Sequence, residues 1–146
     1  MKRIYLAGPF FSEEQVARIE KIEQSLEHNE TVENYFSPRH HQETTSERFS
    51  APWANEIYHQ DMDEIKKCDV IVALLDFEHQ TMDPGTAYEL GVAKMLDIPV
   101  IAFQEKDEAV NLMITETVRA YTNSIEMIQT YDFDTCPTSQ FVGEYI

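Results

Sequence analysis

The chain has 146 residues, with 27 Asp and Glu against 11 Lys and Arg, a formal net charge of −16. This length suits a single domain over residues 1–146, and a hydrophobic content of 42% is enough to build a core. The negative charge repels phosphate backbones and argues against nucleic acid as a partner. No run of about 18 apolar residues is present, which argues against a membrane span. A small, neutral or weakly charged ligand suits this surface better.

The first elements of the chain alternate between strand and helix patterns. Residues 3–7 form a short apolar run that a Gly-Pro turn ends, which predicts a buried strand. The run is too short for a secretory signal and acidic residues follow it, so we expect a cytoplasmic protein. Ser12 and Gln15 have the spacing of a capping box and predict a helix start. Residues 32–36 predict a second strand, and the polar residues 37–51 a long, functional loop.

The middle of the chain continues the alternation. Pro52 suits the first turn of a helix that runs to about Lys67, and Asp61 falls in the apolar row of that helix. Residues 69–75 are a continuous β-branched and apolar run, typical of a parallel strand covered on both faces.

The second half of the chain predicts two more strands. The stretch from Gly85 onward is a helix pattern that is apolar on almost every side, which is typical of a buried helix. Residues 98–103 predict a buried strand, 111–120 a helix and 124–128 a last strand. The tail over residues 131–146 is aromatic and irregular, and we expect it to pack on another surface.

Strands that alternate with helices indicate an α/β fold, a flavodoxin-like, doubly wound sheet of five parallel strands with helices on both faces. Such sheets bind ligands at the carboxyl ends of their strands, at the switch between strands 1 and 3. Those ends are residues 7–11 and 76–83, and the second leads directly into the helix that carries Glu89.

Glu89 lies in the middle of this apolar helix, where an unpaired carboxylate costs free energy. Buried carboxylates with few partners cluster at functional sites, so Glu89 is the leading candidate for a catalytic residue. Asp83 at the start of the helix is either an N-cap, a ligand contact or both. Asp61 is either a surface acid or a group at the pocket mouth. Tyr5 is either a core residue or a hydrogen-bond donor to a deep carboxylate such as Glu89.

The sequence shows no motif for dinucleotide or P-loop binding, for another catalytic nucleophile or for a metal site. The glycines do not form a dinucleotide fingerprint or a P-loop, and no Ser, Cys or Lys nucleophile stands in a recognisable setting. Cys68 and Cys136 show no metal spacing and are expected to be reduced, structural thiols, so we expect no metal and no cofactor. Several carboxylates around one pocket are the groups that perform glycosidic bond chemistry.

The chain resembles the nucleoside 2-deoxyribosyltransferases over nearly its whole length. The similarity rests on five segments: "IYLAGPFF", "PRHHQ", "WANEIYHQDMDEIKKCDVIVALLD", "DPGTAYELGVA" and "NLM". Enzymes of that family move a 2-deoxyribosyl group from one nucleobase to another in nucleoside salvage, and they assemble as hexamers or smaller homo-oligomers with shared active sites.

The resemblance implies roles for particular residues of this chain. Glu89 matches the nucleophile, Tyr5 the tyrosine that positions it, and Asp61 the acid beside the base. Further residues match positions that bind substrate, with the last two reaching in from a neighbouring subunit: Asp83 at a sugar hydroxyl, Gln42 at the base edge, Gly8, and Asn111 and Met113.

Two alternatives stay open. A 2-deoxynucleoside 5′-monophosphate N-glycosidase has a similar fold and uses water as the acceptor, but it needs phosphate donors that the acidic surface and the "AGPFF" turn do not offer. A non-catalytic nucleoside or nucleotide sensor on the same scaffold would bind and leave the glycosidic bond intact.

Overall fold

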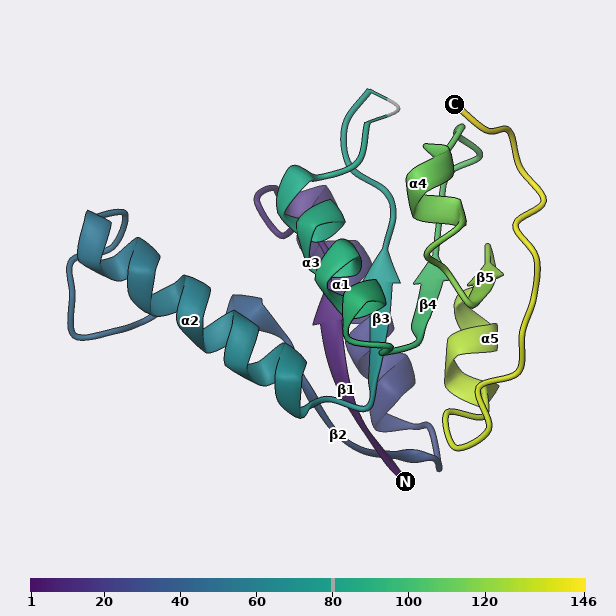
Figure 1. Ribbon diagram of the computed structural model, residues 1–146, viewed down its shortest axis with the longest axis horizontal. Helices are drawn as coiled ribbons and strands as arrows, with labels where there is room; N and C mark the ends of the chain where they lie inside the picture. Colours follow the sequence, from purple (N-terminus) through teal and green to yellow (C-terminus); the bar gives the residue numbers. More distant parts are fainter. Residues whose placement is uncertain (80) are drawn as a thin grey trace.

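The computed structural model describes residues 1–79 and 81–146, and in this part of the chain five parallel strands form a single sheet (Figure 1). The strands are β1 (Lys2–Ala7), β2 (Val32–Phe36), β3 (Val70–Leu74), β4 (Val100–Phe103) and β5 (Ala120–Thr122). Their order across the sheet is β2-β1-β3-β4-β5, so the expected flavodoxin-like fold class is confirmed.

Helices cover both faces of the sheet. The helical elements are α1 (Glu13–Glu27), the 3₁₀ turn η1 (Pro38–His40), α2 (Ala51–Lys67), α3 (Pro84–Met95), α4 (Leu112–Thr115) and α5 (Ile125–Thr130). One core lies between the sheet and helices α1 and α5, and the other lies between the sheet and the side of α2, α3 and α4. None of the described helices is both long and apolar enough to cross a membrane.

Strand β1 divides its side chains between these two cores. Ile4 and Leu6 belong to the core on the α1 side, whereas Tyr5 and Ala7 belong to the core on the α3 side. This alternation follows from the two-residue period of a strand. It places the Tyr5 ring under helix α3, and the side chain is completely buried.

The prediction for residues 111–130 is partly wrong. The expected helix over 111–120 is only the short α4, and residues 124–128 begin helix α5 rather than a strand. The fifth strand is the three-residue β5, which pairs with β4. Ile125 and Ile128 are spaced for a helix as well as for a short apolar run, and Ile128 is fully buried against the α1 side of the sheet.

The tail after residue 130 is irregular, as expected, and it packs on its own chain. Phe133 is completely buried, and Phe141 is nearly so. Near the end, Val110 and Tyr145 form a parallel bridge, and the amide of Ile146 donates to the carbonyl of Val110 at 3.0 Å. The end of the chain therefore lies beside the segment that leads into α4.

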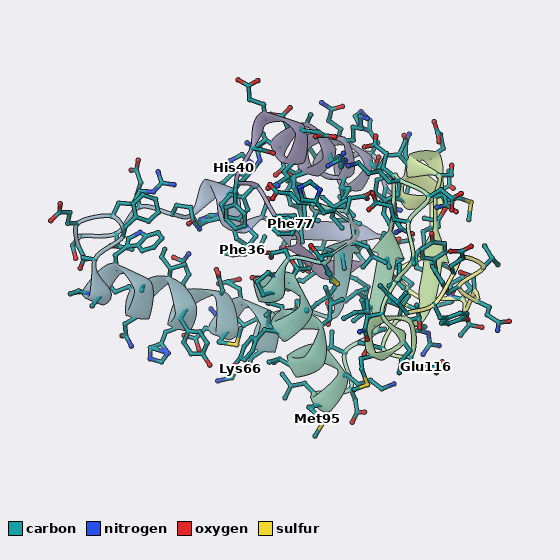
Figure 2. All side chains as sticks on the ribbon, turned by 90° about the horizontal axis from the view of Figure 1, so that it is seen from above. Phe36, His40, Lys66, Phe77, Met95 and Glu116 are labelled. Atoms are coloured by element: carbon teal, nitrogen blue, oxygen red, sulfur yellow. The ribbon has the colours of Figure 1, made fainter. Side chains whose placement is uncertain are left out.

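Helices α2 and α3 leave much of their surface exposed. Figures 1 and 2 show α2 extending away from the sheet, and Ile65 near its end is its one fully buried residue. The prediction that α3 is buried on almost every side is wrong, because its buried residues are Thr86, Leu90 and Ala93. Met95, labelled in Figure 2, is 84% exposed at the end of α3.

Candidate active site

A cavity of about 260 Å³ opens where β1 and β3 end, at the switch point of the sheet. Gly8, which follows β1, is at its wall, and a Cβ at this position would lie 2.9 Å from both Ile19 Cδ1 and Leu74 Cβ. A side chain larger than hydrogen would therefore force the wall to move. The cavity is lined by Gly8, Phe10, Phe11, Pro38, Gln42, Ile57, Tyr58, Asp61, Met62, Asp83, Gly85, Tyr88 and Glu89.

The Tyr5 hydroxyl donates a hydrogen bond to Glu89 Oε2. The expected contact between a buried phenol and a deep carboxylate is thus present. No arginine supplies a partner instead, because four of the five bind groups elsewhere and the guanidinium of Arg48 lies over the ring of Phe49. Glu89 therefore meets a neutral donor, which positions its carboxylate without neutralising it.

The electrostatic setting of Glu89 favours its protonated form. Burial raises its pKa to about 8, the Tyr5 hydrogen bond acts in the opposite direction, and the charges of Asp61 and Asp83 raise it further. The pKa of Tyr5 is also raised, first by burial and then by the charge of Glu89, so the phenol keeps its proton. A shift of this size in a cavity is typical of a functional carboxyl.

Asp61 is the second carboxyl of the cavity and comes from α2. Its Oδ1 is buried and has no hydrogen-bond partner among the described residues. Burial raises the pKa of Asp61 to about 6, with a contribution from the charge of Glu64. An acceptor of this kind costs free energy unless a ligand or water meets it. This carboxyl can hold a proton close to neutral pH, as a general acid must.

Asp83 acts as the N-cap of helix α3. Its Oδ2 accepts from the Thr86 amide at 2.8 Å and from the Thr86 hydroxyl at 2.7 Å. The predicted cap is confirmed, with Pro84 in the first turn of the helix. Both of these bonds go to the same oxygen, and Asp83 lines the same cavity as Glu89 and Asp61.

Gln42 reaches the cavity from the loop before α2. Its side-chain Nε2 donates to the Pro38 carbonyl at 2.9 Å, and its backbone carbonyl accepts from Trp53 Nε1 at 2.7 Å. These bonds fix the residue between η1 and α2. They leave its side-chain oxygen without a protein partner among the described residues.

Asn111 and Met113 do not join this cavity in the same chain. They line a second cavity of about 490 Å³, and Ile146 at the end of the chain lies in that wall too. Asn111 caps α4 by accepting from the Met113 amide at 2.9 Å, and Met113 is 70% exposed. The structure therefore brings together six of the eight site residues expected from the sequence: Tyr5, Gly8, Gln42, Asp61, Asp83 and Glu89.

Four aromatic residues line the cavity: Phe10 and Phe11 lie in the segment after β1 that was expected at the site, whereas Tyr58 and Tyr88 were not anticipated from the sequence. The Phe10 and Phe11 rings are tilted by 41° with centroids 5.0 Å apart, and Tyr58 and Tyr88 line the cavity from α2 and α3. Their positions hold a signal, since Tyr58 lies one turn before Asp61 and Tyr88 directly precedes Glu89. Aromatic walls suit a flat heterocycle.

The described residues hold no group of three or more His, Cys, Asp or Glu side chains that could bind a metal ion. No lysine, arginine or histidine is among the described residues that line the cavity either. What the cavity offers is two carboxyls with raised pKa values, a capping carboxylate and an amide.

Comparison with known proteins identifies the family. The family model described as nucleoside 2-deoxyribosyltransferase matches residues 4–130. The chain belongs to this family. Its members are pentosyltransferases, so the resemblance noted from the sequence is confirmed.

Individual nucleoside 2-deoxyribosyltransferases are similar over most of their length. A nucleoside deoxyribosyltransferase of Limosilactobacillus fermentum is 31% identical over 145 residues, which cover 90% of this chain and 85% of that protein. The solved 2-deoxyribosyltransferase of Bacillus psychrosaccharolyticus is 33% identical with a TM-score of 0.82, covering 96% of this chain and 99% of its own. The 2-desoxiribosyltransferase of Leishmania mexicana is 28% identical with a TM-score of 0.57, over 75% and 68% of the two chains.

Proposed function

We propose that this chain transfers the 2-deoxyribosyl group between nucleobases through a covalent glycosyl-enzyme on Glu89, with retention at the anomeric carbon. The observation that carries this proposal is the Tyr5–Glu89 hydrogen bond beside a cavity at the switch point of the sheet. It is supported by family membership and by the similar 2-deoxyribosyltransferases.

In the first half-reaction a Glu89 carboxylate oxygen attacks the anomeric carbon as the bond to the base nitrogen breaks. The electron pair of that bond leaves with the base, and Asp61 supplies the proton that neutralises it. In the second half-reaction the incoming base attacks the same carbon, its proton passes to Asp61, and Glu89 is released. Two displacements at one carbon restore the original configuration.

The remaining residues of the cavity would bind the substrate. The free oxygen of Asp83 would accept a hydrogen bond from a sugar hydroxyl, and the side chain of Gln42 would meet the base edge. Gly8 would allow the substrate to approach the backbone after β1. No metal or organic cofactor enters this scheme.

A nucleoside suits the cavity better than a nucleotide. A 5′-phosphate needs cationic or backbone donors, and the described lining residues include three carboxylates and no Lys or Arg. This disfavours the nucleoside monophosphate glycosidase. A mere sensor would not need a buried carboxyl held by a phenol, which is costly without a chemical use.

We further propose a homo-oligomer in which a neighbouring subunit completes each site through Asn111 and Met113. The cavity at Glu89, at about 260 Å³, is smaller than typical ligand pockets, which hold about 300–1,000 Å³. Helix α2, Met95 and Met113 expose apolar surface that a second subunit would cover. Sedimentation at several concentrations tests this, and a monomer throughout would contradict it. A cytoplasmic location remains a prediction.

Base exchange tests the proposed function directly. Purified protein is incubated with thymidine and adenine, and separately with deoxyinosine and adenine, and the products are separated by chromatography. Deoxyadenosine from both donors indicates transfer with a broad base range, and from deoxyinosine alone a purine-restricted transferase. Free base without a new nucleoside would instead establish a hydrolase, and unchanged substrates would contradict the proposal.

A further inference from the structure

Two exposed tyrosines, one on α2 and one on α3, are hydrogen-bonded to each other at the wall of the cavity. The hydroxyl of Tyr58, on α2, lies 3.0 Å from the hydroxyl of Tyr88, on α3, and the ring centroids are 6.3 Å apart. Both residues line the cavity, and their exposed fractions are 47% and 53%. A hydroxyl both donates and accepts, so the pair forms one hydrogen bond and keeps further bonding capacity.

This hydrogen bond connects helix α2 directly to helix α3. Among the described residues it is the only hydrogen bond or ion pair between α2 and α3. The other polar contacts of α2 outside itself and its cap go to the loop before it: Trp53 to Gln42, Gln60 to His41 and Glu56 to Ser46. Ile65 is the one fully buried residue of α2, and with Met62 it shares a core with Leu90 of α3, so the tyrosine pair adds a polar contact to a small apolar one.

The two helices carry the two carboxyls of the proposed reaction. Tyr58 lies one helical turn before Asp61, and Tyr88 is the neighbour of Glu89. A shift of α2 relative to α3 therefore changes the distance between the Asp61 and Glu89 carboxyls. It also changes how much water reaches them, because α2 forms one wall of the cavity.

We propose that Tyr58 and Tyr88 are positioning residues, a clasp that holds Asp61 at a working distance from Glu89. This inference rests on the proposed function, because it concerns the same two carboxyls. The clasp does not require either hydroxyl to touch the substrate. A proton donor displaced by about 1 Å can cost up to a hundredfold in rate, so a single interhelical bond is enough to matter.

The clasp predicts a different result from the alternative, in which Tyr58 and Tyr88 each contact the substrate independently. Breaking the bond requires the loss of only one hydroxyl, so Tyr58→Phe, Tyr88→Phe and the double variant should all lose the same activity. We expect kcat/KM for base exchange to fall about three- to tenfold in each, the worth of one ordinary hydrogen bond. The loss should lie in kcat, with KM little changed. Losses that multiply in the double variant would overturn the clasp and indicate two independent substrate contacts.

The matched control is Tyr35→Phe, which also removes one partly exposed hydroxyl. Tyr35 donates to Glu27 at 2.7 Å and does not line the cavity. We expect this variant to keep the wild-type kcat/KM.

A second readout needs no turnover. The pKa of Glu89 is followed by NMR of protein with ¹³C-labelled glutamate, assigned with Glu89→Gln. The charged or titratable groups around Glu89 are Tyr5 on β1, Asp61 on α2 and Asp83 at the start of α3. If the clasp opens, Asp61 moves away and water enters, so the pKa of Glu89 should fall in both single variants and not in Tyr35→Phe. An unchanged value would overturn the clasp, whereas failure of wild-type base exchange would overturn the proposed function alone.

Discussion

Tyr5 on strand β1 donates its phenolic proton to Glu89 in the middle of helix α3, 84 residues later in the chain. The bond joins a strand residue that faces the α3 side of the sheet to a carboxyl beside the cavity. It favours the ionised form of Glu89, whereas burial opposes that form. With a pKa of about 8, Glu89 is therefore mostly protonated at pH 7, and the carboxylate that attack needs is the minor form.

Removing the Glu89 carboxyl should abolish base exchange. We expect Glu89→Ala and Glu89→Gln to lower kcat/KM about 10⁴-fold or more, because the proposed glycosyl intermediate forms on the Glu89 carboxylate. Circular dichroism and thermal unfolding should show a folded protein in both cases. Near-normal turnover in either variant would remove Glu89 from the reaction.

The same residue should affect stability in a pH-dependent way. The pKa of Glu89 rises from about 4.3 in an unfolded chain to about 8 in the folded one. The folded state therefore binds more protons between these values, and wild-type stability attributable to Glu89 falls as pH rises through this window. Glu89→Gln should be more stable than wild type by a margin that grows from pH 5 to pH 8. Urea unfolding at both pH values measures it, with Glu30→Gln at an exposed position as the control.

Asp61 should account for the alkaline limb of the pH profile. With pKa values of about 8 for Glu89 and about 6 for Asp61, the pair shares one proton between pH 6 and 8. Wild-type kcat/KM should be bell-shaped with a maximum near pH 7, since attack needs one carboxylate and the leaving base needs one acid. Asp61→Asn should lower the maximum about a hundredfold and leave only a rise with pH. An alkaline limb that persists in this variant would assign the proton donor elsewhere.

The Tyr5 hydroxyl should set the position of that limb. Its hydrogen bond lowers the pKa of Glu89, so Tyr5→Phe should raise that pKa and move the upper limb of the profile to higher pH. The proton that Glu89 and Asp61 share would then reside on Glu89 in a larger fraction of molecules. Because attack needs the Glu89 carboxylate, kcat/KM at pH 7 should fall about tenfold. A profile that keeps its shape would mean that Tyr5 only fills space.

Substitutions can separate the helix cap that Asp83 forms from its proposed contact with a sugar hydroxyl. Asp83→Ala removes the cap on α3 and should cost about 1 kcal/mol of stability. Asp83→Asn keeps an acceptor for the Thr86 amide, so it should unfold much like wild type yet raise KM for the nucleoside. Equal KM values in Asp83→Asn and wild type would leave Asp83 with the cap alone.

The sequence predicts the sheet well because its central strands are continuous apolar runs bounded by turn residues. Strand β3 is buried at every residue, as its β-branched sequence indicates. Strand β5 has only three residues, too few for a period to be read, and the neighbouring Ile125 and Ile128 fit a strand or a helix equally. Pairing with β4 decides which segment is the strand.

The candidate site could be predicted where local rules apply. Glu89 breaks an apolar pattern and Asp83 obeys helix-capping rules, so both are visible in the sequence. Tyr58 and Tyr88 are not, because their contact depends on how α2 lies against α3. Asn111 and Met113 line a second cavity in this chain, and their proposed part in the site at Glu89 would require a neighbouring subunit.

The most direct test of the account is to look for the glycosyl-enzyme itself. Protein mixed with excess deoxyinosine and no acceptor base is quenched in acid within seconds, digested, and analysed by mass spectrometry. We predict a deoxyribosyl adduct on the peptide that contains Glu89, lost when adenine is added before the quench and absent from Glu89→Gln. Efficient base exchange with no adduct at any quench time, or an adduct on another residue, would contradict the central role of Glu89.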